Sequence, residues 1–386
     1  MPVRALPVPS NVARILVLPL IVLVGALQLV QSPVVRAEEG GAFIQTNLVS
    51  DLPNLARVQD TNLKNPWGIV HGPKTPWWVA DNNSNVSTLY DGSGTPFPPA
   101  GPLVVNIPAP GATSGGTPTG VVFNGKSSDF KVSDGTTSGS SLFIFATEDG
   151  TIVGWSPALS LTQGFSAVDN SKVPSSTDGA VYKGLALAET EDGQRLYAAN
   201  FRAGTVDVFD GNFTPVHEPR AFRDRQIPSG YAPFGIQEIG GRIYVSYAQQ
   251  NADRHDDISG AGHGFVDVFN TEGRLLKRLI RRGALDSPWG IAMAPEGFGD
   301  HGGQLLVGNF GNGRINAYDA RSGEFEGVLR RPDGTPVQVE GLWGLAFGNG
   351  NAAGPVDTLF FAAGINHEQN GLFGSLRAAG EENNGN

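Results

Sequence analysis

The sequence predicts an all-β fold, a six-bladed β-propeller of four-stranded blades. The main observation is a short motif that occurs six times, in which a turn residue, one variable residue, a glycine and an apolar run follow one another. Its glycines lie 52, 64, 51, 55 and 54 residues apart, a spacing that suits one blade of four strands with their turns. The 53 glycines and 27 prolines agree with many short strands joined by turns. The motif glycines are Gly68, Gly120, Gly184, Gly235, Gly290 and Gly344.

Each motif is followed by further strand patterns. A second apolar run ends in a polar residue, as in LYAAN at residues 196–200, and a third segment alternates, as in TVDVFDG at residues 205–211. Alternation with a period of two, closed by Asp or Asn and Gly, is typical of a strand that enters a tight turn. A β-helix or a β-sandwich is the alternative fold, but neither explains six motifs at these intervals.

The two chain ends are expected to close the ring. The last repeat lacks an outer strand of its own, whereas residues 43–49 form a spare strand pattern before the first motif. We therefore expect residues 43–49 to complete the sixth blade of a single propeller domain that spans residues 38–378. The polar residues 379–386 are expected to form a disordered tail.

The first 37 residues have the pattern of a signal peptide. Arg4 and Arg14 precede an apolar stretch at residues 15–30, and Val35 and Ala37 are the small residues before an expected cleavage site. An uncleaved anchor is the alternative, but Pro19 interrupts an apolar run that is already short for a membrane span. We expect a secreted or periplasmic protein with no membrane span after cleavage. With 0 cysteines, it must fold without disulfides.

The net charge of −10 argues against two kinds of partner. Nucleic acids and anionic membranes both bind preferentially to a basic protein surface, so we expect neither as the main partner. The expected partner is therefore an unidentified small molecule or a protein.

Three segments resemble a known group of proteins. They read LKNPWGI at residues 63–69, WVADNN at residues 78–83 and FIFATEDGTIVGW at residues 143–155. With these motifs the chain resembles NHL-type propellers and, more closely, an uncharacterised family of exported bacterial six-bladed propellers. The resemblance covers nearly the whole mature chain. It implies fold and export, and it transfers no functional residue.

Polar residues at the ends of the second strands are expected to gather at one mouth of the central channel. A ring of carboxylates and amides there could hold a hard cation such as Ca²⁺. The competing interpretation is structural, because Asp or Asn after a strand commonly caps a turn. The candidate ligand-binding residues are Asp81, Asn82, Glu148, Asn200, Asn309 and His367.

A long loop at residues 249–263 of the fourth blade is the other candidate site. The equivalent loop of the third blade has only residues 201–203, so the extra residues extend over the expected channel mouth. His255, Asp256, Asp257 and His263 could bind a divalent metal, although their spacing matches no established zinc pattern. A solvated loop without a ligand is the alternative.

Two functional hypotheses follow. The first is an exported binding protein that holds a small molecule or a partner at the channel mouth. The second is a metal-dependent hydrolase or lactonase with one divalent ion there, for which Asp81, Glu148, Asn200 and Asn309 are the candidate ligands. A quinone-dependent redox enzyme ranks third, since no residue pattern marks a cofactor site. No nucleophile elbow or P-loop occurs in the sequence.

Overall fold

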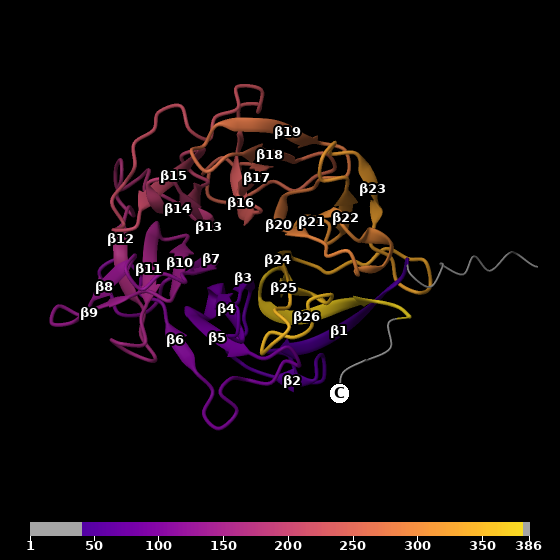
Figure 1. The fold of residues 1–386 in the computed structure, drawn as a ribbon, viewed down its shortest axis with the longest axis horizontal. Helices are drawn as coiled ribbons and strands as arrows, with labels where there is room; N and C mark the ends of the chain where they lie inside the picture. The colour runs from indigo at the N-terminus through magenta and orange to yellow at the C-terminus, as the bar shows by residue number, and fades with distance from the viewer. Residues whose placement is uncertain (1–40, 381–386) are drawn as a thin grey trace, which may run out of the picture. The chain divides into compact units, whose positions relative to one another are not determined.

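The computed structural model describes residues 41–380, and the predicted signal peptide lies outside them. The described residues form six β-sheets arranged around a central axis, so the six-bladed propeller is confirmed (Figure 1). Their only helical segments are two 3₁₀ turns, η1 (Asn82–Ser84) and η2 (Gly299–His301), and none of their helices is long and apolar enough to cross a bilayer. A small hairpin of β8 (Lys131–Ser133) and β9 (Ser138–Ser140) forms a separate two-stranded sheet that packs against the second blade.

The innermost strands lie against one another around the axis, and the motif glycines explain how closely they approach. A Cβ atom on Gly235 would lie 2.1 Å from the carbonyl oxygen of Trp289 in the next blade. On Gly344, it would lie 2.6 Å from the carbonyl oxygen of Trp67, between the sixth and the first blade. Glycine therefore recurs because backbone faces backbone between neighbouring blades. The innermost strands are β3 (Pro66–Val70), β7 (Pro118–Phe123), β13 (Tyr182–Thr190), β16 (Tyr231–Ile239), β20 (Pro288–Met293) and β24 (Leu342–Phe347).

The second strand of each blade pairs antiparallel with the innermost one and ends where that strand begins. Pro66 pairs with Asp81 in the first blade, and Pro288 pairs with Asn309 in the fifth. The polar ends of these strands therefore lie on the same face as the starts of the motifs. The second strands are β4 (Trp77–Asp81), β10 (Phe143–Thr147), β14 (Gly193–Asn200), β17 (Arg242–Gln249), β21 (Leu305–Asn309) and β25 (Leu359–Ile365).

The third strands continue each sheet outward, again in antiparallel pairing. In the first three blades they are β5 (Val86–Tyr90), β11 (Thr151–Trp155) and β15 (Thr205–Asp210), and in the last three they are β18 (Phe265–Phe269), β22 (Ile315–Tyr318) and β26 (Asn370–Ala378).

The third blade has three strands, so the expectation of four in every blade is wrong there. Its outer segment follows β15 with a single bridge between Phe209 and Pro215. Pro215 and Pro219 lack the N–H group that a strand needs for its ladder, which explains why no fourth strand forms. The outer strands of the other blades with a fourth strand of their own are β6 (Val104–Asn106), β12 (Phe165–Asp169), β19 (Leu275–Arg281) and β23 (Phe325–Val328).

The ring is closed by the N-terminal strand, as predicted. The strand β1 (Phe43–Ser50) pairs antiparallel with β26 as the outer strand of the sixth blade, from Phe43 opposite Ala378 to Ser50 opposite Leu372. A two-residue strand, β2 (Val58–Gln59), pairs parallel with β1 along the edge that faces away from β26. The sixth sheet therefore joins both ends of the described chain.

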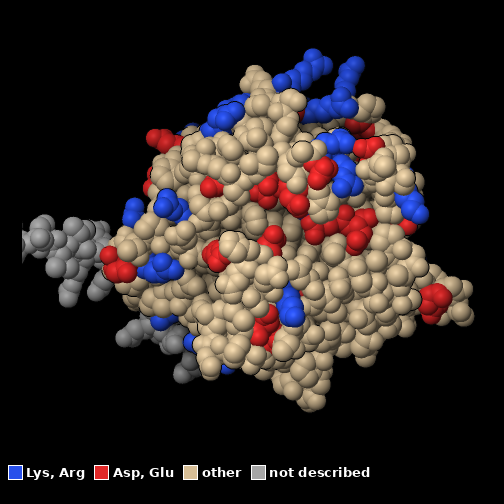
Figure 2. Space-filling model, turned by 180° about the vertical axis from the view of Figure 1, so that it is seen from behind, with Lys and Arg blue, Asp and Glu red and all other residues tan. Residues whose placement is uncertain are grey.

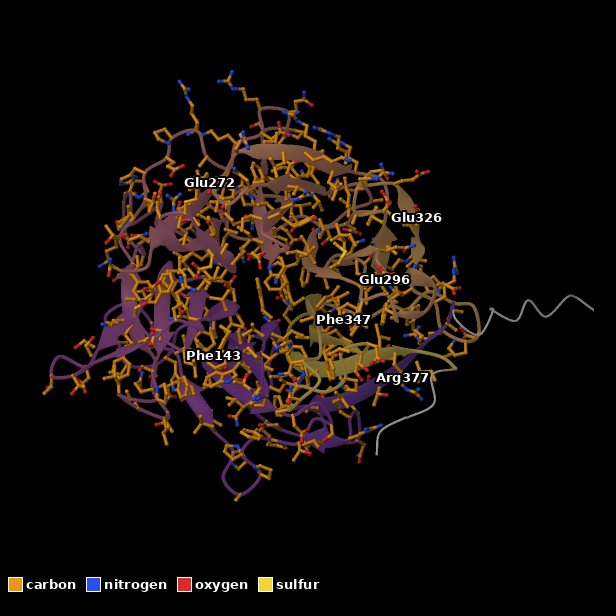
Figure 3. The ribbon with its side chains drawn as sticks, viewed as in Figure 1. Phe143, Glu272, Glu296, Glu326, Phe347 and Arg377 are labelled. Carbon is orange, nitrogen blue, oxygen red and sulfur yellow. The ribbon has the colours of Figure 1, made fainter. Side chains whose placement is uncertain are left out.

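The hydrophobic core is divided among the spaces between neighbouring blades. One cluster of buried side chains fills each of the six spaces, and a seventh lies at the axis. Between the first two blades, the ring of Trp78 stacks on that of Phe143 with centroids 4.1 Å apart. Figure 3 shows side chains filling these spaces and labels Phe143 in the second blade. Each blade thus depends on both neighbours for its buried surface.

Candidate functional site

A polar pocket lies at the channel mouth where the second strands end. Its volume is about 270 Å³, and all six blades contribute residues to it. The first blade provides four of them and the sixth blade another four, whereas the second, third and fifth blades provide one each. The lining residues are Asn65, Trp67, Asn82, Asn83, Glu148, Lys183, His255, Asp256, Asp257, Phe310, Trp343, His367, Glu368 and Gln369.

The pocket carries an excess of negative charge. Glu148, Asp256, Asp257 and Glu368 bring four carboxyl groups into its lining, and Lys183 is the only lysine or arginine among the lining residues. Figure 2, which views the molecule from behind, shows acidic side chains gathered around the middle of that face. The site therefore presents a local negative field to anything that enters it.

Lys183 is a buried charged residue in this lining, with 2% of its surface exposed. Its Nζ forms an ion pair with Glu148 and lies 3.2 Å from Oδ1 of Asp256. Burial alone would lower the pKa of Lys183, but the nearby Glu148 and Asp256 carboxylates outweigh it and raise the pKa above its ordinary value. Lys183 therefore keeps its proton.

Lys183 is one of the lining residues that the sequence pattern did not identify as part of a site. It occupies the variable position of the motif, between Tyr182 and Gly184 in the third blade. A signal was present: four of the six repeats have an aromatic residue at this position, so a lysine there departs from the pattern. The residues at the variable position are Trp67, Thr119, Lys183, Phe234, Trp289 and Trp343.

Stacked aromatic rings form the floor of the pocket. Trp343 stacks between Trp67 and Phe310, with centroid distances of 3.5 Å and 4.0 Å. Lys183 Nζ lies 5.1 Å from the Trp67 ring centroid, within range of a cation–π interaction. Trp289 donates a hydrogen bond from Nε1 to the Lys183 carbonyl oxygen, 2.8 Å away. Trp67 and Trp343 therefore line the pocket while their rings pack against each other.

The long loop of the fourth blade contributes three of its predicted residues to the pocket. Nδ1 of His255 lies 2.8 Å from Oδ1 of Asp256, and the hydrogen bond between them, together with Lys183, lowers the pKa of Asp256. Possible ligand atoms of Glu148, His255 and Asp256 all lie within 4.8 Å of one another, so these three residues could hold a metal ion. His263 does not line the pocket; its ring contacts the carbonyl oxygen of Ile258 at 2.9 Å.

Two further carboxyl groups belong to the pocket but not to this group of three. Asn65 donates a hydrogen bond from Nδ2 to Oε1 of Glu368 at 3.1 Å, and Ser259 donates one from its hydroxyl to Oδ2 of Asp257 at 3.2 Å. Burial raises the pKa of both Asp257 and Glu368. No lysine or arginine among residues 41–380 forms an ion pair with either group.

Two of the predicted channel-mouth residues line the pocket beside Glu148. Asn82 donates a hydrogen bond from Nδ2 to Oε2 of Glu148 at 2.8 Å, which fixes the carboxylate that pairs with Lys183. His367 lines the pocket from the sixth blade and is exposed. Whether these residues bind a ligand stays a prediction.

The other three predicted residues do not line the pocket, and their side chains form hydrogen bonds elsewhere. The Asp81 carboxylate accepts hydrogen bonds from the backbone N and the hydroxyl of Thr88, at 3.0 Å and 2.7 Å. Asn200 donates to Asp207 at 2.9 Å, and Asn309 donates to the Ala284 carbonyl at 2.8 Å. The turn-capping role weighed above as the alternative is seen at Asn200, whose Oδ1 also accepts a hydrogen bond from the backbone N–H of Ala203 at 3.2 Å.

The fold and the site define a six-bladed β-propeller with an acidic pocket at one channel mouth. The chain belongs to the same family as the uncharacterized protein R648 of Acanthamoeba polyphaga mimivirus, with 34% identity over 335 residues, 85% of this chain and 78% of R648. The uncharacterized protein L690 of the same virus is 32% identical over 334 residues, 85% of this chain and 84% of L690. No family model matches the chain.

A solved structure supports the fold alone. A protein of unknown function from Bacteroides thetaiotaomicron superimposes with a TM-score of 0.51 and 12% identity, over 87% of this chain and 76% of that protein. The propeller part of the expected resemblance is confirmed. The relatives by sequence are viral, however, so the family is not restricted to bacteria as the resemblance had implied.

Proposed function

We propose that this chain is an exported binding protein that holds a small polar ligand in the channel-mouth pocket. The observation that supports it is the pocket itself, which receives side chains from every blade and encloses the buried Lys183. A charged side chain is rarely buried unless it is paired or has a function. Export is supported by the signal sequence predicted for residues 1–37.

The state of Lys183 favours binding over covalent catalysis. A lysine that attacks a carbonyl group needs a lowered pKa, so that its amine is free at neutral pH. The Glu148 and Asp256 carboxylates instead raise the pKa of Lys183. Lys183 therefore acts as a fixed positive charge that orients the two carboxylates.

The test is to recover whatever ligand the protein carries. Protein purified from its exported fraction is denatured, and the released small molecules are identified by mass spectrometry. Gln369→Trp, at an exposed position in the lining, should fill the pocket and abolish the release of a ligand. Glu191→Trp, at an exposed turn outside the pocket, is the matched control. A ligand that both variants retain would contradict binding in this pocket.

A metal-dependent hydrolase or lactonase is the second candidate, favoured by the group formed by Glu148, His255 and Asp256. A divalent ion held there would polarise a carbonyl group and activate a water molecule. Lys183 opposes it, because its ammonium already neutralises two of the three ligands. A dication about 4 Å from an ammonium group is repelled by roughly 8 kcal/mol at an effective dielectric constant of about 20.

Elemental analysis together with thermal melts in EDTA separates the two candidates. The binding proposal predicts a purified protein without stoichiometric metal, whose melting temperature EDTA does not change. One equivalent of retained metal, with a melting temperature that EDTA lowers, would instead support the hydrolase.

A further inference from the structure

The charge balance of the pocket limits the chemistry of its ligand. Lys183 forms ion pairs with Glu148 and Asp256. Asp257 and Glu368 form no ion pair with a lysine or arginine among the described residues, although the charge of Lys183 attracts both groups from a greater distance. A cation that enters the pocket would therefore meet two lining carboxyl groups with which no lysine or arginine of residues 41–380 forms an ion pair. An anionic ligand would instead meet four carboxyl groups.

The pocket already contains one ammonium group, that of Lys183. Its Nζ lies between the Glu148 and Asp256 carboxylates and over the ring of Trp67. This arrangement shows which surroundings suit an ammonium group here: carboxylates at its sides and polar amides nearby. Asp257 and Glu368, with the amide groups of Asn83 and Gln369, offer the same chemistry in the part of the lining that Lys183 does not occupy.

A second, independent feature is an unused hydrogen-bond donor at the pocket floor. Trp67 is 2% exposed and lines the pocket, and its Nε1 has no hydrogen-bond partner among residues 41–380. The other two motif tryptophans both use this group, Trp289 with the Lys183 carbonyl and Trp343 with Asn65. A buried indole N–H without an acceptor is unfavourable, so a ligand that supplies an oxygen atom there is favoured.

The size of the pocket restricts the ligand further. Its volume of about 270 Å³ equals that of about nine water molecules, since each takes up about 30 Å³ in the liquid. A molecule the size of an amino alcohol or a single amino sugar fits this volume, and a folded protein domain does not.

We propose that the pocket selects small organic cations, namely protonated amines that also carry a hydroxyl or carbonyl oxygen, through Asp257, Glu368 and Trp67. This inference rests on the proposed function, because it names the class of ligand for the same pocket. The ammonium group lies between the Asp257 and Glu368 carboxylates, and the oxygen atom accepts the Trp67 N–H.

The test compares three probes that share a six-carbon polyhydroxylated skeleton and differ in charge. Glucosamine is positive, glucose is neutral and gluconate is negative at neutral pH. Isothermal titration calorimetry of the full mature protein should give an affinity for glucosamine at least tenfold higher than that for glucose, and no binding of gluconate. Higher salt should weaken the binding of glucosamine.

Isosteric variants then assign the binding to the pocket. Asp257→Asn and Glu368→Gln should each weaken glucosamine binding about tenfold, and both variants keep the size and hydrogen bonds of the native side chains. Asp253→Asn, an exposed position in the same loop but outside the lining, is the matched control and should bind like the native protein. Unchanged melting temperatures would show that all three variants fold.

The outcomes separate this inference from the proposed function. If glucose or gluconate binds as tightly as glucosamine and Gln369→Trp blocks it, the ligand class is wrong while the pocket is still a binding site. If no probe binds, or if Asp257→Asn and Glu368→Gln leave glucosamine binding unchanged, selectivity for cations is overturned. The proposed function is then judged separately, on the ligand released by denaturation.

Discussion

Lys183 and Glu148 form an ion pair at the floor of the channel-mouth pocket, between the third and the second blade. The two side chains are nearly removed from water, with exposures of 2% for Lys183 and 13% for Glu148. Asn82 of the first blade holds the second oxygen of Glu148, and Asp256 of the fourth blade contacts the Lys183 ammonium. Four blades thus meet in one network of charged and polar groups.

Loss of the lysine should therefore destabilise the ring. Lys183→Met leaves the Glu148 and Asp256 carboxylates without their cation, and removal of one partner from a buried pair costs about 3 kcal/mol. Urea unfolding should show this decrease in the free energy of unfolding. Lys126→Met, which removes an exposed pair with Glu189, should change the free energy by less than about 1 kcal/mol. If the two substitutions lowered the free energy of unfolding equally, the ion pairs of Lys183 would not stabilise the ring as proposed.

The close approach of the innermost strands gives a second prediction. Gly235→Ala places a methyl group 2.1 Å from the Trp289 carbonyl oxygen, so the fourth and fifth blades must move apart. We expect a loss of about 2 kcal/mol or more in the free energy of unfolding. Gly297→Ala is the control, because a Cβ at that exposed turn meets no atom within 4 Å. A Gly235→Ala protein as stable as Gly297→Ala would mean that the motif glycines have another purpose.

These glycines also explain why the fold could be predicted from the sequence. The contact that requires glycine occurs once in every blade, so it produces a repeated motif with a readable spacing. The strand β1 was predicted to close the ring because the sixth repeat lacked an outer strand. The missing strand of the third blade was not predicted, because the repeat led to an expectation of four strands in every blade and the effect of Pro215 and Pro219 was not considered.

The candidate site could be predicted only in part. Asn82, Asn200 and Asn309 all follow or end a second strand and look alike in the sequence, yet only Asn82 of the three reaches the pocket. The difference depends on the hydrogen-bond partner of each amide group. Asn82 donates to Glu148 of the next blade, whereas Asn200 donates to Asp207 of its own blade. These hydrogen-bond partners are determined by contacts between blades, which a single sequence does not reveal.

A buried carboxyl group in the fourth blade makes stability depend on pH. Burial, helped by the nearby Asp224, raises the pKa of Asp267 to about 7 in the folded protein. Its Oδ2 has no hydrogen-bond partner among the described residues. Because the ordinary pKa of Asp is about 3.9, the folded state binds this proton more tightly than the unfolded state does. The resulting stability is complete below about pH 4 and is lost as the pH rises through about 7.

Asp267→Asn should remove this dependence. Between pH 5 and pH 8, the native protein should lose roughly 2 kcal/mol more of its free energy of unfolding than the variant does. Asp333→Asn is the control, because hydrogen bonds from Thr335 lower the pKa of Asp333 and its effect appears only in acid. If Asp267→Asn keeps the native pH dependence between pH 5 and pH 8, Asp267 is not the group responsible.

Lys183 also determines whether the pocket accepts a metal ion. In Lys183→Met, the repulsion of a dication disappears, while Asn82 still holds Glu148 and His255 still contacts Asp256. The three residues whose ligand atoms lie within 4.8 Å of one another are therefore free to gather around a metal ion. A carboxylate, an imidazole and a second carboxylate are ligands that zinc and cobalt accept. We therefore expect Lys183→Met to bind Co²⁺ at least tenfold more tightly than the native protein does, with a visible absorption band from the bound ion.

Two further observations decide whether that ion occupies this site. Zn²⁺ should raise the melting temperature of Lys183→Met and leave that of the native protein unchanged, because a ligand bound to the folded state stabilises it. Adding His255→Ala to Lys183→Met should abolish both the absorption band and the rise in melting temperature. If the native protein binds Co²⁺ as tightly as Lys183→Met does, the ammonium group of Lys183 does not exclude the metal, and the hydrolase becomes the better account of the pocket.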